Sequence, residues 1–292
     1  VLITGANSGI GLQAARALAE HGAHVVLACR SRPKAEAARD QILAAAPSAQ
    51  VSLVDLDLTS LAAVQVAAAE VIGRFDSLDV LINNAGVMAT PHEVTVDGYE
   101  LQVATNLLGH AALTAHLLPL LLVTDASRVV TVSSLAHRFG KIAFDDLQSQ
   151  RGYRAWRAYG QSKLANLLFT FELQRRLAAA GAGTVAVAAH PGVSDTNLAG
   201  STGGLTGTLM SATKPLAKLF SQSSQMGALP TLRAAVDPAV RGGEYVGPDG
   251  FMEQRGHPQV VQASAAANDT AVAARLWDVT VELTGVPFQG LG

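Results

Sequence analysis

A tyrosine and a lysine four residues apart, Tyr159 and Lys163, form the pattern with the clearest chemical meaning in this chain. Four residues make about one helical turn, so both side chains lie on one face of a helix. A phenol has a pKa of about 10 and exchanges protons poorly at neutral pH. An ammonium group one turn away favours the phenolate and should lower that pKa. The pair therefore predicts an acid/base centre, and the Ser134 hydroxyl could hold a substrate oxygen beside it.

A glycine-rich turn near the start of the chain is the second chemical pattern. It reads Thr4-Gly5-Ala6-Asn7-Ser8-Gly9-Ile10-Gly11, between an apolar strand and an amphipathic helix. A tight turn against a pyrophosphate needs residues without side chains, and a helix N-terminus supplies free N–H groups. The strand-turn-helix context favours a dinucleotide site over glycines that merely cap a helix. The residues expected at the phosphates are Gly5, Asn7, Ser8, Gly9 and Ile10.

The end of the second predicted strand indicates which dinucleotide binds. In NAD-binding folds an acidic residue there bonds the ribose hydroxyls. This strand ends in Leu27-Ala28-Cys29-Arg30-Ser31-Arg32 and offers no carboxylate. A guanidinium pairs bidentately with a phosphate, so Arg30 predicts NADP(H). The alternative is that Arg30 and Arg32 are only solvated residues ahead of a helix, and Cys29 is expected to be a small buried residue.

Other polar residues follow the later strands. Asn83-Asn84-Ala85-Gly86 ends the fourth predicted strand, and Ser133-Ser134 ends the fifth. Asn106 lies inside the helix between them, where asparagine is a poor helix former. Ligands of doubly wound sheets bind at the carboxyl ends of the strands. We therefore expect these groups to gather around Tyr159.

Alternating apolar runs and longer helical stretches must position these residues, and they predict an α/β Rossmann fold with a doubly wound parallel sheet. The strands are expected at Val1–Thr4, His24–Ala28, Gln50–Asp55, Leu78–Ile82, Arg128–Val132 and Thr184–Ala189. The helices between them are expected at Gly11–His21, Pro33–Ala46, Ser60–Phe75, Gly98–Leu121 and Tyr159–Ala180.

The pattern changes after Pro191. Residues 197–225 combine several glycines with Leu, Met and Phe, which predicts a substrate lid after the sixth strand. The alternative is a surface loop followed by a core-packed helix at Lys214–Gln225. Further elements are expected as a helix at Ser224–Val236, a short strand at Glu244–Val246 and a final helix at Ala267–Leu283. The last helix places Val272, Leu276, Val279 and Leu283 on one face.

Composition limits the classes of protein. With 292 residues, 49% hydrophobic and 15% charged, the chain is expected to form a single domain over residues 1–292. A net charge of −2 offers no attraction to nucleic acid. One cysteine and no metal-ligand spacing predict no metal site, and no apolar run is long enough to span a membrane. The single cysteine fits a location in the reducing cytoplasm. The chain opens inside the apolar run Val1–Ile3, so the start of that strand is expected to be missing.

The ordered motifs resemble those of the short-chain dehydrogenase/reductase family over nearly the whole chain. The matching residues are Thr4, Gly5, Gly9 and Gly11; Asn83 to Gly86; Asn106; Ser134; Tyr159 and Lys163; and Pro191, Gly192 and Thr196. The resemblance implies that Tyr159 is the acid/base, that Lys163 binds the nicotinamide ribose and that Asn106 supports a water relay.

The same resemblance assigns the other contacts of the cofactor. Asp57, with its neighbour Leu58, would contact the adenine, and Val193 and Thr196 would meet the carboxamide of the nicotinamide. Asn84, Ala85, Gly86, Pro191 and Gly192 would complete the cofactor site. The family also implies a homodimer or homotetramer, paired through the helices at Gly98–Leu121 and Tyr159–Ala180.

Ser134 and Tyr159 are 25 positions apart, and the segment between them resembles that of the retinol dehydrogenase and protochlorophyllide reductase-like branch. This branch implies an NADP(H)-dependent enzyme that interconverts apolar aldehydes or ketones and their alcohols. Met88 and Trp156 could line an apolar pocket, or could simply pack in the core. One alternative function is a non-catalytic NADP(H)-binding redox sensor, which would be expected to lose the tyrosine, lysine or serine. A nucleotide-sugar epimerase or dehydratase is disfavoured by the small region after Pro191.

Overall fold

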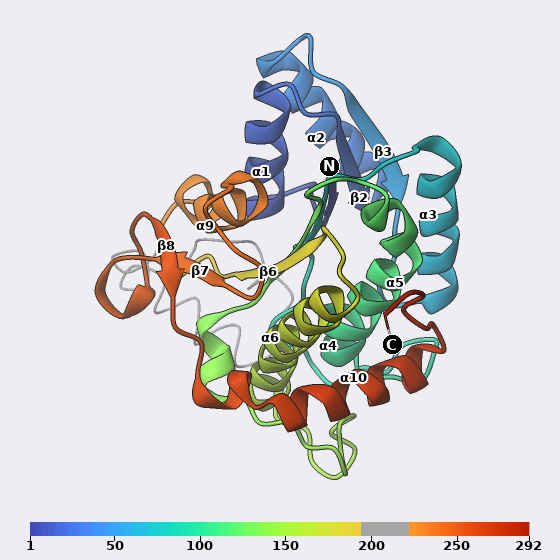
Figure 1. Ribbon diagram of the computed structural model, residues 1–292, viewed down its shortest axis with the longest axis vertical. Helices are drawn as coiled ribbons and strands as arrows, with labels where there is room; N and C mark the ends of the chain where they lie inside the picture. Colours follow the sequence, from blue (N-terminus) through green and yellow to red (C-terminus); the bar gives the residue numbers. More distant parts are fainter. Residues whose placement is uncertain (194–221, 292) are drawn as a thin grey trace.

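An eight-stranded sheet in the order β3-β2-β1-β4-β5-β6-β7-β8 forms the centre of the molecule (Figure 1). The computed structural model describes residues 1–193 and 222–291. The first seven strands pair in parallel, and β8 runs antiparallel to β7. The strands are β1 Leu2–Thr4, β2 Val25–Cys29, β3 Val51–Asp55, β4 Val80–Asn83, β5 Arg128–Val132, β6 Val185–Ala189, β7 Tyr245–Pro248 and β8 Pro258–Val261.

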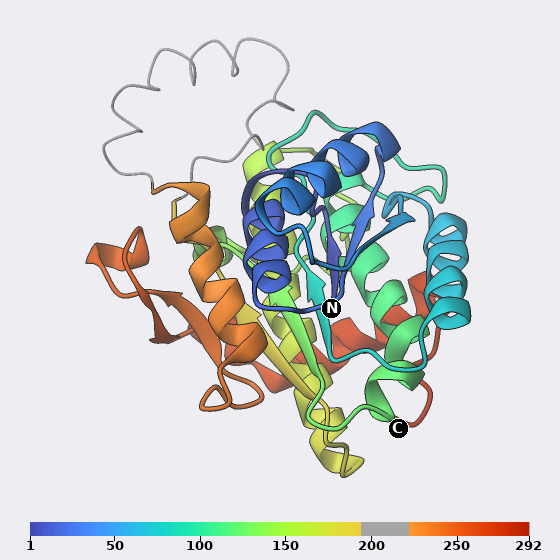
Figure 2. The same cartoon turned by 90° about the horizontal axis from the view of Figure 1, so that it is seen from above.

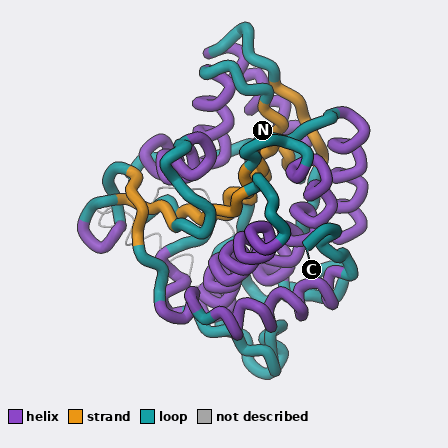
Figure 3. The backbone as a smooth tube through the Cα atoms, viewed as in Figure 1, coloured by secondary structure: helices purple, strands orange, loops and turns teal. Residues whose placement is uncertain are grey.

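Helices cover both faces of this sheet (Figure 3), and each face has its own apolar core. One face carries α1 Gly9–Glu20, α2 Arg32–Ala45 and α9 Ser224–Val236. The other carries α3 Leu61–Arg74, α4 Leu101–Val103, α5 Gly109–Leu122, α6 Ala155–Ala179 and α10 Thr270–Thr284. The central strands are therefore buried on both sides, which explains their continuous apolar runs. The predicted doubly wound single domain is confirmed.

The six strands predicted before Pro191 are present, with ends shifted by at most two residues. The seventh is present and extends to Pro248, whereas β8 was not predicted. It is a run of four residues with a proline at its first position and two exposed side chains, so it carries little strand pattern. Figure 2 shows β7 and β8 at the edge of the sheet opposite α3.

The long helix predicted at Gly98–Leu121 is interrupted. It begins at Leu101 after Glu100, whose carboxylate accepts the N–H groups of Gln102 and Val103. Residues Ala104–Leu108 then form a π-helical turn, and α5 follows. Such turns are often found at functional sites. By length and hydropathy Leu101–Leu122 could cross a membrane, but 83% of its apolar window is buried inside the fold.

Helix α6 begins at Ala155, one turn before the predicted start, so Tyr159 lies in its second turn. Helix α10 covers it from outside, with Trp277 stacked on Phe169 at 5.5 Å (Figure 1). Because α10 and α3 of the same chain pack on α6 and α5, the predicted assembly surface is largely covered. Oligomerisation through these helices stays a prediction.

The final helix starts later than predicted, because Ala265–Asn268 forms a 3-10 turn and Asp269 caps Thr270–Thr284. Of the predicted apolar face, Leu276 is fully buried and the other three residues are partly buried. The predicted substrate lid falls almost entirely outside the described residues, as does most of the helix predicted at Lys214–Gln225; Ser224 already belongs to α9.

Candidate active site

The turn between β1 and α1 forms a cradle with no room for side chains. Gly5 and Gly9 adopt left-handed backbone conformations, with φ of +65° and +55°. A Cβ atom on Gly11 would lie 2.5 Å from the Asn84 amide nitrogen and 2.6 Å from the Gly5 carbonyl oxygen. Ser8 caps α1 without a side-chain hydrogen bond, and the first turn holds no acidic residue. This helix N-terminus thus fits a dinucleotide pyrophosphate.

The Thr4 hydroxyl ties the cradle to the loop after β4. Its oxygen accepts the backbone N–H groups of Asn84 and Ala85, both at 2.9 Å. The Asn84 side chain returns a hydrogen bond to the Thr4 carbonyl oxygen at 2.8 Å. The strand order places this contact between β1 and β4, where the winding of the sheet reverses and ligands bind.

A buried histidine that sequence reasoning did not place in the site, His110, completes this half. Its Nε2 lies 2.9 Å from Thr4 Oγ1, and its Nδ1 lies 3.2 Å from the Asn106 carbonyl oxygen. Because the Asn106 carbonyl oxygen can only accept, the ring proton lies on Nδ1, and Nε2 is left to accept from the Thr4 hydroxyl. Burial lowers the pKa of His110 to about 4. The spacing of four residues from Asn106 was the available signal.

Asn106 is fully buried in the π-helical turn. Its side chain exchanges hydrogen bonds with the backbone of Val87, at 2.9 and 3.0 Å, and donates to Ser162 Oγ at 2.9 Å. Its carbonyl oxygen faces His110 Nδ1, and the part of Asn106 in a water relay stays a prediction. A Cβ on Gly86 would lie 3.1 Å from Asn106 Oδ1 and 3.4 Å from Lys163 Nζ. The predicted loop after β4 therefore does meet Asn106 and Lys163.

Tyr159 and Lys163 are both buried on one face of α6, as their spacing predicts. Lys163 Nζ donates to the Val132 carbonyl oxygen at 3.0 Å and lies 5.9 Å from the centre of the Tyr159 ring. Burial lowers the pKa of Lys163 to about 8. The expected drop in the pKa of Tyr159 is not found: burial raises that pKa, and only a hydrogen bond from Ser134 opposes the rise. The Lys163 ammonium lies over the face of the Tyr159 ring and donates its hydrogen bond to the Val132 carbonyl oxygen.

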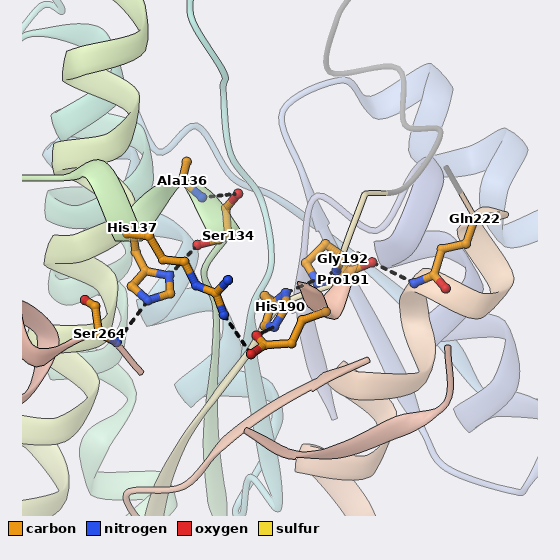
Figure 4. Close-up of polar contacts among 10 residues, drawn as sticks. Ser134, Ala136, His137, His190, Pro191, Gly192, Gln222 and Ser264 are labelled. Carbon is orange, nitrogen blue, oxygen red and sulfur yellow. Dashed lines mark hydrogen bonds and ion pairs between the residues drawn. The ribbon is translucent and has the colours of Figure 1, made fainter. Parts of the chain in front are cut away.

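The two serines after β5 have different surroundings. Ser133 is buried, and its hydroxyl donates to the Lys163 carbonyl oxygen at 2.8 Å. Ser134 is half-buried, interacts with Tyr159 and accepts the Ala136 N–H at 3.2 Å (Figure 4). The geometry thus places Ser134 beside Tyr159 and ties the Ser133 hydroxyl to the backbone of α6.

The residues predicted to meet the adenine half of the cofactor, Arg30, Asp57 and Leu58, follow β2 and β3. Arg30 is exposed and forms no ion pair with any described residue, whereas Arg32 pairs with Glu36 at 3.3 Å and Asp55 at 3.6 Å. Asp57 Oδ1 accepts both the N–H and the hydroxyl of Thr59, at 3.0 and 2.7 Å. Leu58 is buried next to Gly109, where a Cβ would lie 2.5 Å from the Leu58 carbonyl oxygen.

The segment after β6 borders the site on the side away from β2 and β3. Gly192 has a φ of +64°, and the Val193 N–H donates to the Gln254 carbonyl oxygen at 2.7 Å. Gln222 donates to the Pro191 carbonyl oxygen at 2.8 Å (Figure 4). Thr196, the last predicted cofactor contact, lies outside the described residues.

Comparisons with known proteins agree with this geometry. The family model for short chain dehydrogenase matches residues 1–204. Human retinol dehydrogenase 13 is 42% identical over 291 residues, covering 98% of this chain and 84% of its own length. Human retinol dehydrogenase 11 is 39% identical, covering 99% and 86%.

Solved structures show the same fold. An uncharacterized protein of Mycobacterium Paratuberculosis is 45% identical, with a TM-score of 0.81 and coverage of 98% of this chain and 93% of that one. A Beutenbergia cavernae protein assigned as an NAD(P) dependent gluconate 5-dehydrogenase, solved with bound NADP, is 26% identical, with a TM-score of 0.65 and coverage of 84% and 92%. This chain thus belongs to the short-chain dehydrogenase family and is an oxidoreductase of CH–OH groups, similar to the retinol dehydrogenases and built to use a nicotinamide cofactor.

Proposed function

We propose that this chain interconverts an apolar aldehyde or ketone and its alcohol with NADP(H), and that Tyr159 is the acid/base. One observation carries the proposal: Tyr159 lies buried beside Ser134 and Lys163, and Lys163 in turn lies close to Gly86, on the loop that Thr4 ties to the glycine cradle. A redox sensor of the same fold would not need a phenol and a serine aimed at one point.

Ser134, Tyr159 and Lys163 each have a separate part in the proposed reaction. The nicotinamide supplies or accepts the hydride when it is bound. In reduction Ser134 holds the carbonyl oxygen by hydrogen bond, and Tyr159 donates its proton to that oxygen. Burial raises the pKa of Tyr159, which keeps the phenol in the protonated form that this step requires. The Lys163 ammonium, 5.9 Å from the ring centre, stabilises the phenolate that remains.

Preference for NADP(H) rests on the end of β2. Arg30 is exposed without an ion-pair partner in the described chain, so its guanidinium is available to a 2′-phosphate. The nearest carboxylate, Asp55 at the end of β3, pairs with Arg32 instead. The NADP found in the Beutenbergia cavernae structure gives further support.

An apolar substrate is supported by the surface beside Tyr159. Trp156 packs edge-on against the Tyr159 ring at 6.0 Å and remains 47% exposed, so it is not a core residue. Phe139 packs near Gly160 and is 59% exposed. Met88 is half-buried on the loop after β4. Exposed aromatic groups next to an acid/base suit an apolar carbonyl compound, as the names of the retinol dehydrogenase relatives also suggest.

The test is an NADPH-oxidation assay with retinal and medium-chain aldehydes, comparing the wild type with Tyr159→Phe. We expect kcat to fall on the order of 100- to 10,000-fold while NADPH affinity is kept, because only the proton donor is removed. Tyr99→Phe is the matched control, since the Tyr99 hydroxyl bonds the Leu283 carbonyl oxygen away from the site. Near-normal kcat in Tyr159→Phe would refute the assignment.

A further inference from the structure

We infer that Glu253, in the connection between β7 and β8, is a positioning residue that fixes the two catalytic loops relative to each other. One loop follows β5 and carries Ser134; the other follows β6 and carries Pro191 and Gly192. The inference rests on the proposed function, because it assigns these loops to the substrate and the nicotinamide.

The Glu253 carboxylate reaches both loops at once. One oxygen accepts from Arg138 Nη2 at 2.7 Å, and the other lies 3.0 Å from His190 Nε2. Arg138 stands four residues after Ser134, and His190 immediately precedes Pro191. A single side chain on a third segment therefore bridges the two.

At the His190 end of this bridge the imidazole is buried, and its hydrogen bonds fix which ring nitrogen carries the proton. The His190 side chain is 0% exposed, and its Nδ1 accepts the Gly192 N–H at 3.2 Å (Figure 4). Since Nδ1 is an acceptor, the ring proton sits on Nε2 and points at Glu253. A Cβ on Gly247 would lie 2.1 Å from that Nε2, so β7 leaves space for the ring only because it has a glycine there.

The backbone next to Glu253 adds a second connection. The Gln254 carbonyl oxygen accepts the Val193 N–H at 2.7 Å, and a Cβ on Gly192 would lie 2.3 Å from that oxygen. The β7–β8 connection thus touches the nicotinamide loop through both side chain and main chain.

The conformation at this point is unfavourable by itself. Met252 and Glu253 are consecutive non-glycine residues in the left-handed region, with φ of 51° and 57°. Such residues persist only where their surroundings hold them. Met252 is 59% exposed and Phe251 is 82% exposed, so packing of the neighbouring apolar side chains does not hold this turn. Backbone hydrogen bonds within the turn hold it, from the Glu253 N–H to the Gly250 carbonyl oxygen at 2.9 Å and from the Gln254 N–H to the Phe251 carbonyl oxygen at 3.1 Å. The contacts to Arg138, His190 and Val193 add to this hold and link the strained turn to the catalytic loops.

Glu253→Gln tests the inference, because glutamine keeps the size but has one acceptor oxygen for two donors. We expect kcat to fall about tenfold, with the Kd for NADPH changed less than threefold. The fluorescence of bound NADPH should lose part of its enhancement, since the nicotinamide ring is held less rigidly. Glu244→Gln is the matched control: Glu244 caps the other end of β7, at the Arg241 N–H, and should leave both readouts unchanged.

Arg138→Gln provides a second variant that removes only one arm, at a residue whose side chain is 39% exposed, and should lower kcat less. Wild-type kcat and NADPH fluorescence in Glu253→Gln would overturn the inference. If the proposed function is wrong, the wild type will not reduce carbonyl compounds. The fluorescence of bound NADPH would still show whether Glu253 positions the loop after β6.

Discussion

The two halves of the active site are built by different means. The half after β1 and β4 depends on backbone and neutral groups: the glycine cradle, the Thr4 hydroxyl and the Asn84 amide. The half after β5 and β6 depends on charged side chains from distant segments, with Glu253 between Arg138 and His190. Small residues in a tight turn form a motif in the sequence, whereas a bridge between residues 138, 190 and 253 does not.

His110 in the first half and His190 in the second are both fully buried, and their partners differ in the same way. His110 faces a hydroxyl and a carbonyl oxygen, so no carboxylate compensates a charge on its ring, and the hydrogen bond to Asn106 only partly opposes the lowering of its pKa by burial. His190 faces the Glu253 carboxylate, which opposes the lowering of its pKa by burial. Protonation at low pH should therefore destabilise the fold more at His110 than at His190.

The largest effect expected from this comparison is on acid stability, through His110. Its pKa is about 4 in the folded protein and 6.5 for an ordinary histidine, so the unfolded chain binds more protons between these pH values. The contribution of His110 to the free energy of unfolding should therefore be largest above pH 6.5 and fall by about 3 kcal/mol towards pH 4. His110→Gln should remove most of this dependence, measured by urea unfolding at several pH values.

His116 gives the control for that experiment, as a half-buried histidine on the same helix. His116→Gln should leave the acid dependence nearly as it is in the wild type. An unchanged pH dependence in His110→Gln would mean that the neutral half is not acid-sensitive, and the contrast between the two histidines would be lost.

The backbone-built half should also be intolerant of a single methyl group. In Gly11→Ala the new Cβ would lie 2.5 Å from the Asn84 amide nitrogen, which cannot yield without giving up its bond to Thr4. We expect a loss of about 1–3 kcal/mol in the free energy of unfolding. Gly73→Ala, inside α3 with open space around its Cβ, should instead gain up to about 1 kcal/mol. Equal effects of the two substitutions would show that the cradle is not sterically limited.

The same difference between the two halves explains which parts of the fold and the site could be predicted from the sequence alone. The parallel strands and the motif residues were predictable because apolar runs and glycine turns are local signals. His110 reaches Thr4 across 106 residues, and its role depends on a π-helical turn that no local pattern indicated. The pKa of Tyr159 was predicted in the wrong direction, because the spacing to Lys163 says nothing of burial. Glu253 and β8 carry no motif, so only the folded chain shows that they meet the site.

The last expected effect concerns cofactor affinity at the outer end of the backbone-built half, where we propose that the exposed charge of Arg30 selects NADP(H). Arg30→Asp replaces a phosphate partner by a repelling carboxylate, which can instead accept from the ribose hydroxyls of NAD(H). A charge-assisted hydrogen bond contributes about 1.5–3 kcal/mol, so the Kd for NADPH should rise roughly tenfold or more. The Kd for NADH should stay equal or fall, because that ribose has no phosphate. Arg32→Gln serves as the control: Arg32 is engaged with Glu36 and Asp55, so its loss should alter the ratio of the two dissociation constants far less. If Arg32→Gln changes the ratio more than Arg30→Asp does, the 2′-phosphate is bound by Arg32, and cofactor choice depends on side-chain pairing in this half as well.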